Sequence, residues 1–184
     1  MALRRNHFIN LNYLRAGNSR QQLVYKVIKQ IKLWEKLDDY NPVLAGTIPL
    51  GIDTKDSDLD ILCEVSDFDT FKVQIQKEFS GYDNFSLQAG QVRSGPYMAI
   101  SFRYAEFVFE LFAQNKPVLE QHAFRHMIIE DYFLLTRGEA FKAMIIALKN
   151  QGSKTEPAFA KVLGLSGDPY LELLNLEKQI SHMR

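Results

Sequence analysis

The spacing of the apolar residues constrains the fold of this chain more than any other feature, because its period changes twice. Apolar residues first recur at steps of three and four, which is typical of one helix face and predicts a helix over residues 19–38. Residues 84–113 instead contain three short runs rich in aromatic and β-branched residues, which predicts strands. From residue 116 onward the helical spacing returns. The chain therefore combines a mixed part with a purely helical part.

The turn residues complete this order of elements. Residues 43–45 and 58–65 are predicted strands, with a turn at 46–51 between them, and residues 67–80 form a predicted helix that Gly81 ends. The later elements are strands at 85–88, 97–102 and 106–112, helices at 117–135 and 139–151, and two short helices within 157–182. Pro117 is expected in the first turn of its helix, and Gly138 breaks the pattern. This order predicts a mixed α/β core with an N-terminal arm and helix over residues 1–115, followed by an all-helical part over residues 116–184.

Charge and composition exclude some classes of function. The chain has 22 Lys and Arg against 22 Asp and Glu, so it lacks the excess of cations on which duplex nucleic-acid binding depends. With 46% hydrophobic residues a packed core is expected, and the single Cys63 allows no disulfide within the chain. No apolar run approaches a membrane span and the N-terminus does not read as a secretory signal. We therefore expect a cytoplasmic protein with no membrane association.

The strand over residues 58–65 carries the chemistry. Residues two apart on a strand share a face, so one face holds Leu59, Ile61, Cys63 and Val65, and the other holds Asp58, Asp60, Leu62 and Glu64. The apolar face is expected to lie on the core. By the same argument Glu110 points away from the core in the last strand. If the two strands are neighbours, Glu110 joins Asp58 and Asp60.

Three crowded carboxylates indicate a divalent cation. They repel one another, so without a cation one of them tends to protonate. Hard cations such as Mg²⁺ take oxygen ligands and commonly bind one or two carboxylates together with substrate phosphates. An Asp-x-Asp pattern on a strand is also common on an ordinary solvated face, so the residues in front of it matter.

A glycine turn lies in front of the two aspartates. Gly46 and Thr47 follow an apolar strand, and ten residues separate Thr47 from Asp58. A glycine there allows a phosphate to approach the backbone closely, while the Thr47 and Ser57 hydroxyls can donate hydrogen bonds to it. A glycine in an ordinary turn is the alternative for this segment taken alone.

The combination resembles a known signature. Leu44-Ala45-Gly46-Thr47, then Asp58-Leu59-Asp60-Ile61 and Phe109-Glu110-Leu111, is similar to the motif of the DNA polymerase beta nucleotidyltransferase superfamily. The wider strings 46–53 and 57–65 resemble an uncharacterised bacterial family of small proteins placed in that superfamily. The resemblance implies an α+β fold, in which a nucleotidyltransferase-like mixed sheet is flanked by helices and followed by the helical C-terminal part.

The resemblance also implies an activity. It is the metal-dependent transfer of a nucleoside monophosphate from a nucleoside triphosphate to a small-molecule or protein acceptor. Asp58, Asp60 and Glu110 would be catalytic and would bind Mg²⁺ or Mn²⁺, with Glu110 helping to deprotonate the acceptor, while Gly46, Thr47 and Ser57 would bind the nucleotide. Two residues depart from the pattern: Thr47 stands where serine or glycine is usual, and Glu110 where aspartate is commoner. A non-catalytic nucleotide-binding or antitoxin-like module of the same fold is the alternative.

Other polar residues offer weaker candidates. His122, His126 and Glu130 share one face of a predicted helix at a spacing that zinc sites use, although such a face is more often an ordinary polar one. Arg125 or His126 could face the substrate from the helical part. The cations expected nearest the polar face of the sheet are Lys55, Arg93 and Arg103.

Overall fold

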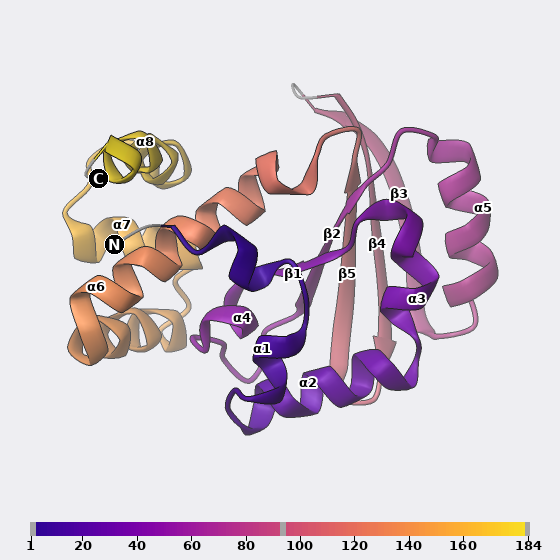
Figure 1. Cartoon of the computed structure of the whole chain (residues 1–184), viewed down its shortest axis with the longest axis horizontal. Coiled ribbons are helices and arrows are strands. Elements are labelled where there is room, and N and C mark those ends of the chain that lie inside the picture. The colour runs from indigo at the N-terminus through magenta and orange to yellow at the C-terminus, as the bar shows by residue number, and fades with distance from the viewer. Residues whose placement is uncertain (1–2, 93–94, 183–184) are drawn as a thin grey trace.

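A five-stranded mixed sheet forms the centre of the computed structural model, which describes residues 3–92 and 95–182 (Figure 1). The strands lie in the order β1-β2-β5-β4-β3. Their bounds are Val43–Ala45 for β1, Leu59–Glu64 for β2, Asp83–Val92 for β3, Gly95–Tyr104 for β4 and Phe107–Gln114 for β5. Only the β2–β5 pair among these five is parallel. The predicted strands are all present, and each of the last three is longer than expected.

The N-terminal residues form several short helices. They are the 3₁₀ turn η1 (Arg5–Phe8), α1 (Asn12–Arg15), α2 (Ser19–Gln30), α3 (Leu33–Leu37) and the 3₁₀ turn η2 (Asp38–Tyr40). Asn18 caps α2 in a capping box with Gln21. The single predicted helix over 19–38 is wrong in one respect: Lys32 adopts a left-handed conformation with φ 54°, which separates α2 from α3.

One face of the sheet is covered by helices. Helices α2, α3 and α5 (Phe68–Phe79) pack against it, and Asp67 caps α5 as the predicted helix over 67–80 requires. The sheet residues in this core include Leu59, Ile61, Cys63, Phe102, Phe109 and Leu111. The prediction that the apolar side of the 58–65 strand lies on the core is therefore confirmed.

The opposite face is only partly covered. The helical C-terminal part packs over β1 and β2, where Leu62 is 2% exposed and joins a second core with Val43 and Phe124. Leu62 lies on the same face of β2 as Asp60, yet it is buried because the helical C-terminal part covers it. Beyond that layer, the Asp60 and Glu110 side of the sheet stays open.

The C-terminal part consists of helices only. It contains the 3₁₀ turn η3 (Val118–Glu120), α6 (His122–Asn150), α7 (Thr155–Leu163) and α8 (Pro169–His182). The predicted break at Gly138 is confirmed, since its φ of 75° and ψ of −169° kink α6. Pro117 is not in the first turn of the long helix, as was expected, but caps η3.

The N-terminal arm reaches the helical part (Figure 1). Arg4 donates two hydrogen bonds to Asp131 of α6, at 2.9 Å and 2.6 Å, and Phe8 belongs to the second core. The division into residues 1–115 and 116–184 stays a prediction, with the arm linking the two units. None of the helices in the described ranges is both long and apolar enough to cross a membrane.

Candidate active site

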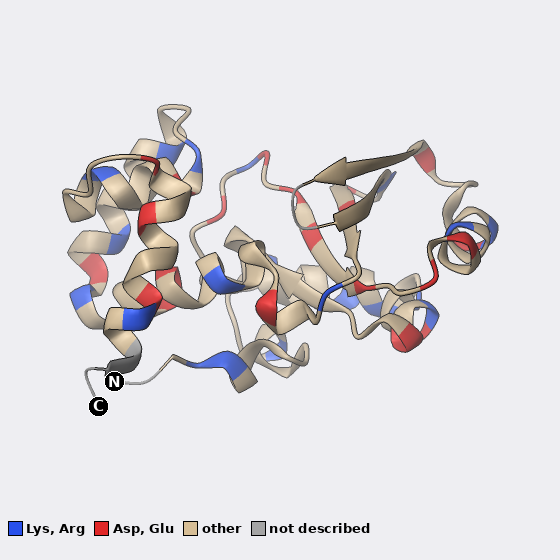
Figure 2. Ribbon diagram, turned by 90° about the horizontal axis from the view of Figure 1, so that it is seen from above, with Lys and Arg blue, Asp and Glu red and all other residues tan. Residues whose placement is uncertain are grey.

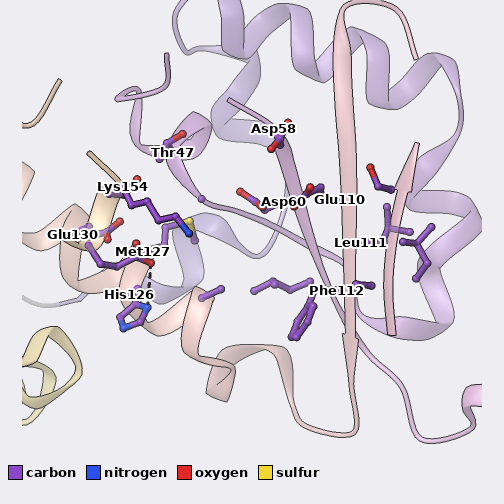
Figure 3. A pocket seen from close by; sticks show the side chains of 18 of the residues that line it. Thr47, Asp58, Asp60, Glu110, Leu111, Phe112, His126, Met127, Glu130 and Lys154 are labelled. Atoms are coloured by element: carbon purple, nitrogen blue, oxygen red, sulfur yellow. Dashed lines mark ion pairs between the residues drawn. The ribbon is translucent and has the colours of Figure 1, made fainter. Parts of the chain in front are cut away.

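The open part of the second face brings together acidic residues from two neighbouring strands. Asp60 of β2 and Glu110 of β5 are Cα partners in the parallel pair, so they lie side by side about 4.8 Å apart at the backbone. Asp58 lies two residues before Asp60, just ahead of the first residue of β2. Figure 3 shows the carboxyl groups of all three on the same side of the sheet. The alternation of each strand directs these side chains away from the core, and the pairing of β2 with β5 brings them together.

The glycine turn lies directly against Asp60. Gly46 follows β1, and Ala45 pairs with Asp60 across the sheet. A Cβ atom added at Gly46 would lie 2.2 Å from Oδ2 of Asp60, and Gly46 has a φ of 77°. Both conditions require a glycine at this position.

Thr47 and Ser57 also meet beside the carboxylates. The Thr47 hydroxyl donates to Oγ of Ser57 at 3.3 Å, and the backbone N–H of Thr54 donates to the same Oγ at 2.9 Å. Thr47 lines the cavity described below, whereas Ser57 is not part of its wall. Ser57 therefore holds the loop in front of β2 against Thr47.

Burial and mutual repulsion raise the pKa values of the acidic residues. Burial, followed by the charges of Glu110 and Asp58, raises the pKa of Asp60 to about 7. Burial and then the charge of Asp58 raise the pKa of Glu110. Burial also raises the pKa of Asp58, against the opposite effect of nearby Arg103. The repulsion among these ionised carboxylates is unfavourable, and a bound cation would reduce it.

The carboxylates open into a cavity of about 630 Å³. One wall is the sheet, with Asp58, Asp60 and Glu110 in the middle. Towards β4 and β3 the wall continues with Ser101, Ser86 and Gln88, and Ser101 is the Cα partner of Glu110. The other wall is helical and is formed by residues of α6 and the start of α7 (Figure 3).

The helical wall supplies residues that the sequence did not single out. Lys154 precedes α7 and its side chain extends into the cavity towards Asp60 (Figure 3). Glu156 follows it and lies 3.5 Å from Nδ1 of His126. The only signal for them in the sequence was the break at Gly152, which precedes this turn. The spacing of apolar residues cannot indicate which distant strand a loop after a helix will face.

A backbone carbonyl and a carboxylate contact the two ring nitrogens of His126. Nε2 of His126 donates to the backbone oxygen of Tyr170 at 2.9 Å, because a carbonyl can only accept. Nδ1 faces Glu156, and the ring centroids of His122 and His126 are 6.4 Å apart. His126 lines the cavity, and the expectation that it could face the substrate stays a prediction. Arg125 instead pairs with Glu177 on the other side of α6.

The donor set fits a hard cation in its chemistry. Three carboxylates in one wall of the cavity, all with raised pKa values, are oxygen ligands whose repulsion a cation would offset. The side chains do not converge as they stand: among the residues described, no three His, Cys, Asp or Glu form a group arranged to hold a metal ion. A cation held by all three carboxylates would require these side chains to rotate towards one another about their χ angles.

The three basic residues expected near the polar face of the sheet have different surroundings. Arg103 acts on the charge of Asp58. Lys55 is exposed, and its backbone oxygen accepts a hydrogen bond from Arg20. Arg93 lies outside the described residues. Cations and anions are interspersed over the sheet and the helices, in keeping with the zero net charge (Figure 2).

Comparison with known proteins identifies one family and one fold. A family model described as "Domain of unknown function (DUF4269)" matches residues 26–176 of this chain. No curated protein matches.

Solved structures are similar at low sequence identity. A structure of the Cid1 RNA terminal uridylyl transferase matches with a TM-score of 0.55 and 16% identity, covering 79% of this chain and 48% of that one. Cid1 poly(U) polymerase bound to MgGTP matches with a TM-score of 0.51 and 18% identity, covering 76% of this chain and 47% of that one. The polymerase core of TRAMP, an RNA surveillance complex, matches with a TM-score of 0.51 and 8% identity, covering 91% and 59%.

These likenesses establish the fold. The chain spans about half the length of the Cid1 structures. The predicted α+β fold is confirmed: a nucleotidyltransferase-like mixed sheet is flanked by helices and followed by a helical C-terminal part.

Proposed function

Since the chain belongs to the DUF4269 family, whose description names no activity, we propose from the geometry of the site that it is a metal-dependent nucleotidyltransferase. It would move a nucleoside monophosphate from a nucleoside triphosphate to a small-molecule or protein acceptor. The observation that carries this proposal is the pairing of Asp60 with Glu110 on adjacent parallel strands, with Asp58 and the Gly46 turn beside them. The fold shared with nucleotidyltransferases supports it.

The three carboxylates would hold Mg²⁺ or Mn²⁺. When bound, the cation would neutralise triphosphate charge and align the attacking and leaving oxygens. Glu110, whose pKa is raised by burial and Asp58, would accept the proton of the acceptor as the new bond to the α-phosphorus forms. Pyrophosphate would leave from the opposite side.

The order of the strands would set the direction of the proposed transfer. Gly46 and Thr47 follow β1, at one edge of the sheet, and they would hold the β- and γ-phosphates. Lys154 extends into the cavity from the helical wall and would balance charge on the same phosphates (Figure 3). Because the attacking and leaving oxygens lie in line, the acceptor would approach from the opposite side, over β5, β4 and β3.

Beyond Glu110, the acceptor side of the cavity is lined by uncharged residues, some polar and some apolar. They are Ser101, Ser86, Gln88, Ala99, Ile100, Leu111 and Phe112. Lys154 is the only Lys or Arg in the cavity wall as far as the structure describes the chain, and it lies on the other side. A polyanionic acceptor needs cations to neutralise its phosphates. This lining would suit a small molecule or a protein side chain as the acceptor.

The test is transfer of label from nucleoside triphosphates. Each α-labelled nucleoside triphosphate is incubated with cell lysate, Mg²⁺ and either the wild type or the Asp58→Asn plus Asp60→Asn variant. An Asp39→Asn plus Asp83→Asn variant, which changes two exposed aspartates, is the matched control. We expect the wild type and the control to transfer label and release pyrophosphate. The Asp58→Asn plus Asp60→Asn variant should transfer no label.

Two outcomes would contradict the proposal. Equal transfer by the wild type and the site variant would show that these carboxylates do not catalyse it. Nucleotide binding without consumption, in the presence of every lysate fraction, would support the alternative of a non-catalytic nucleotide-binding or antitoxin-like module. The bacterial origin and the cytoplasmic location stay predictions from the sequence.

A further inference from the structure

The helical wall of the cavity contains a buried carboxyl group that lacks a hydrogen-bond partner. Glu130 of α6 is 3% exposed, and its Oε1 atom makes no hydrogen bond. It lines the same cavity as the three carboxylates and shares one face of α6 with His126 and Met127, as Figure 3 shows. An unsatisfied buried polar atom lowers stability by about 1–3 kcal/mol, so such a group needs an explanation.

The charged neighbours of Glu130 do not satisfy it. Lys149, near the end of α6, donates from Nζ to Oγ1 of Thr155 at 3.0 Å, and Glu156 of α7 faces His126. None of the ion pairs found among the described residues includes Glu130. Burial, followed by the charge of Glu156, raises the pKa of Glu130 well above its ordinary value, and Lys149 opposes this. In its un-ionised form the carboxyl group of Glu130 offers one donor and one acceptor.

The position of Glu130 relative to the acidic residues restricts its possible ligand. Lys149 and Glu156 act electrostatically on both Asp60 and Glu130, and these two carboxyl groups line the same cavity. In the proposed reaction the phosphates lie over β1 and β2, and the acceptor approaches over β5 and β4. The helical wall is the remaining direction in which the nucleoside of the bound triphosphate can extend.

We propose that Glu130 recognises the nucleobase of the nucleoside triphosphate by paired hydrogen bonds to its edge. This inference rests on the proposed nucleotidyltransferase function. A carboxyl group with one donor and one acceptor is complementary to the adjacent N–H and acceptor atoms of an amide or amidine edge, which nucleobases present. The base would lie against Met127 and His126, on the same helix face.

Two substitutions distinguish recognition of the nucleobase by Glu130 from a structural role of this residue. Glu130→Gln keeps one donor and one acceptor, whereas Glu130→Met keeps the length and removes both. Replacing an unsatisfied buried polar group by an apolar one of similar shape is nearly neutral or stabilising. If instead Glu130 stabilised the fold through Lys149, the methionine variant would unfold at a lower temperature. Glu139→Met, at an exposed position of α6 beyond the Gly138 kink, is the control.

The measurement is binding by calorimetry in the presence of Mg²⁺, with each of the four nucleoside triphosphates and with inorganic tripolyphosphate as probes. We expect Glu130→Met to weaken the best-bound nucleoside triphosphate by about tenfold, the effect of losing one or two hydrogen bonds. Tripolyphosphate should bind with the wild-type affinity, because it has no base. Glu130→Gln should stay within about threefold of the wild type, and the melting temperature of Glu130→Met without ligand should be unchanged or higher.

The outcomes distinguish this inference from the function on which it rests. A wild type that binds no nucleoside triphosphate would overturn both. A wild type that binds one, together with a Glu130→Met variant of equal affinity, would overturn only the recognition of the base. The same holds if that variant loses tripolyphosphate as strongly as nucleotide and also melts at a lower temperature, since Glu130 would then be structural.

Discussion

Replacing Asp60 by asparagine should make the metal-free protein more stable. Burial and the charges of Glu110 and Asp58 raise the pKa of Asp60 from 3.8 to about 7. At 1.36 kcal/mol per pKa unit, this rise corresponds to roughly 4 kcal/mol of lost stability once the group is ionised in both states. Asparagine relieves the repulsion but is itself desolvated, so about 2 kcal/mol should be regained. For a chain of this length that is about 4–8 °C in melting temperature.

The pH dependence of this gain has a defined sign. Because the folded pKa of Asp60 lies above the unfolded one, ionisation destabilises the folded state fully above about pH 7. Below the unfolded pKa of 3.8 the carboxyl is protonated in both states, and the penalty disappears. The melting temperature of Asp60→Asn should therefore exceed that of the wild type most at pH 8, and less than half as much at pH 5.

The assay is thermal unfolding in the presence of a chelator, followed by circular dichroism between pH 5 and pH 8. Asp83→Asn, at an exposed position of β3, should leave the melting temperature within about 1 °C of the wild type. If Asp60→Asn melts at or below the wild-type temperature at pH 8, the carboxylates do not repel one another as the structure indicates. A gain that is the same at every pH would equally refute the electrostatic argument.

Three further substitutions test other parts of the molecule. Gly46→Ala should abolish label transfer and lower the free energy of unfolding in urea by about 1–3 kcal/mol, because its side chain would meet the Asp60 carboxylate at a positive φ. Gly81→Ala, with open space around its Cβ, should change neither label transfer nor stability. Lys154→Ala should weaken nucleoside triphosphate binding about tenfold at an unchanged melting temperature, and Lys161→Ala on the exposed side of α7 should not. Asp131→Asn breaks the paired hydrogen bonds from the N-terminal arm and should lower the melting temperature by several degrees. This loss should be the same whichever nucleotide is present.

Much of the fold could be predicted because it depends on local patterns. The alternation of residues 58–65 was enough to separate the core side of β2 from the side that carries Asp60, and a glycine was enough to locate the kink in α6. The break between α2 and α3 could not be predicted in this way. Lys32 is a good helix former, so its left-handed conformation does not follow from its own preference.

The sequence by itself determined which residues point away from the core, since a strand directs alternate side chains to opposite faces whatever its neighbours are. It therefore identified Asp58, Asp60 and Glu110 as candidates, and it placed Gly46 in a turn. Only the tertiary structure decided that β5 lies beside β2, that Leu62 is buried under a second layer, and that Glu130 and Lys154 face the same cavity. These facts depend on which elements pack together, and that pairing is set by the burial of whole faces rather than by any local spacing of residues.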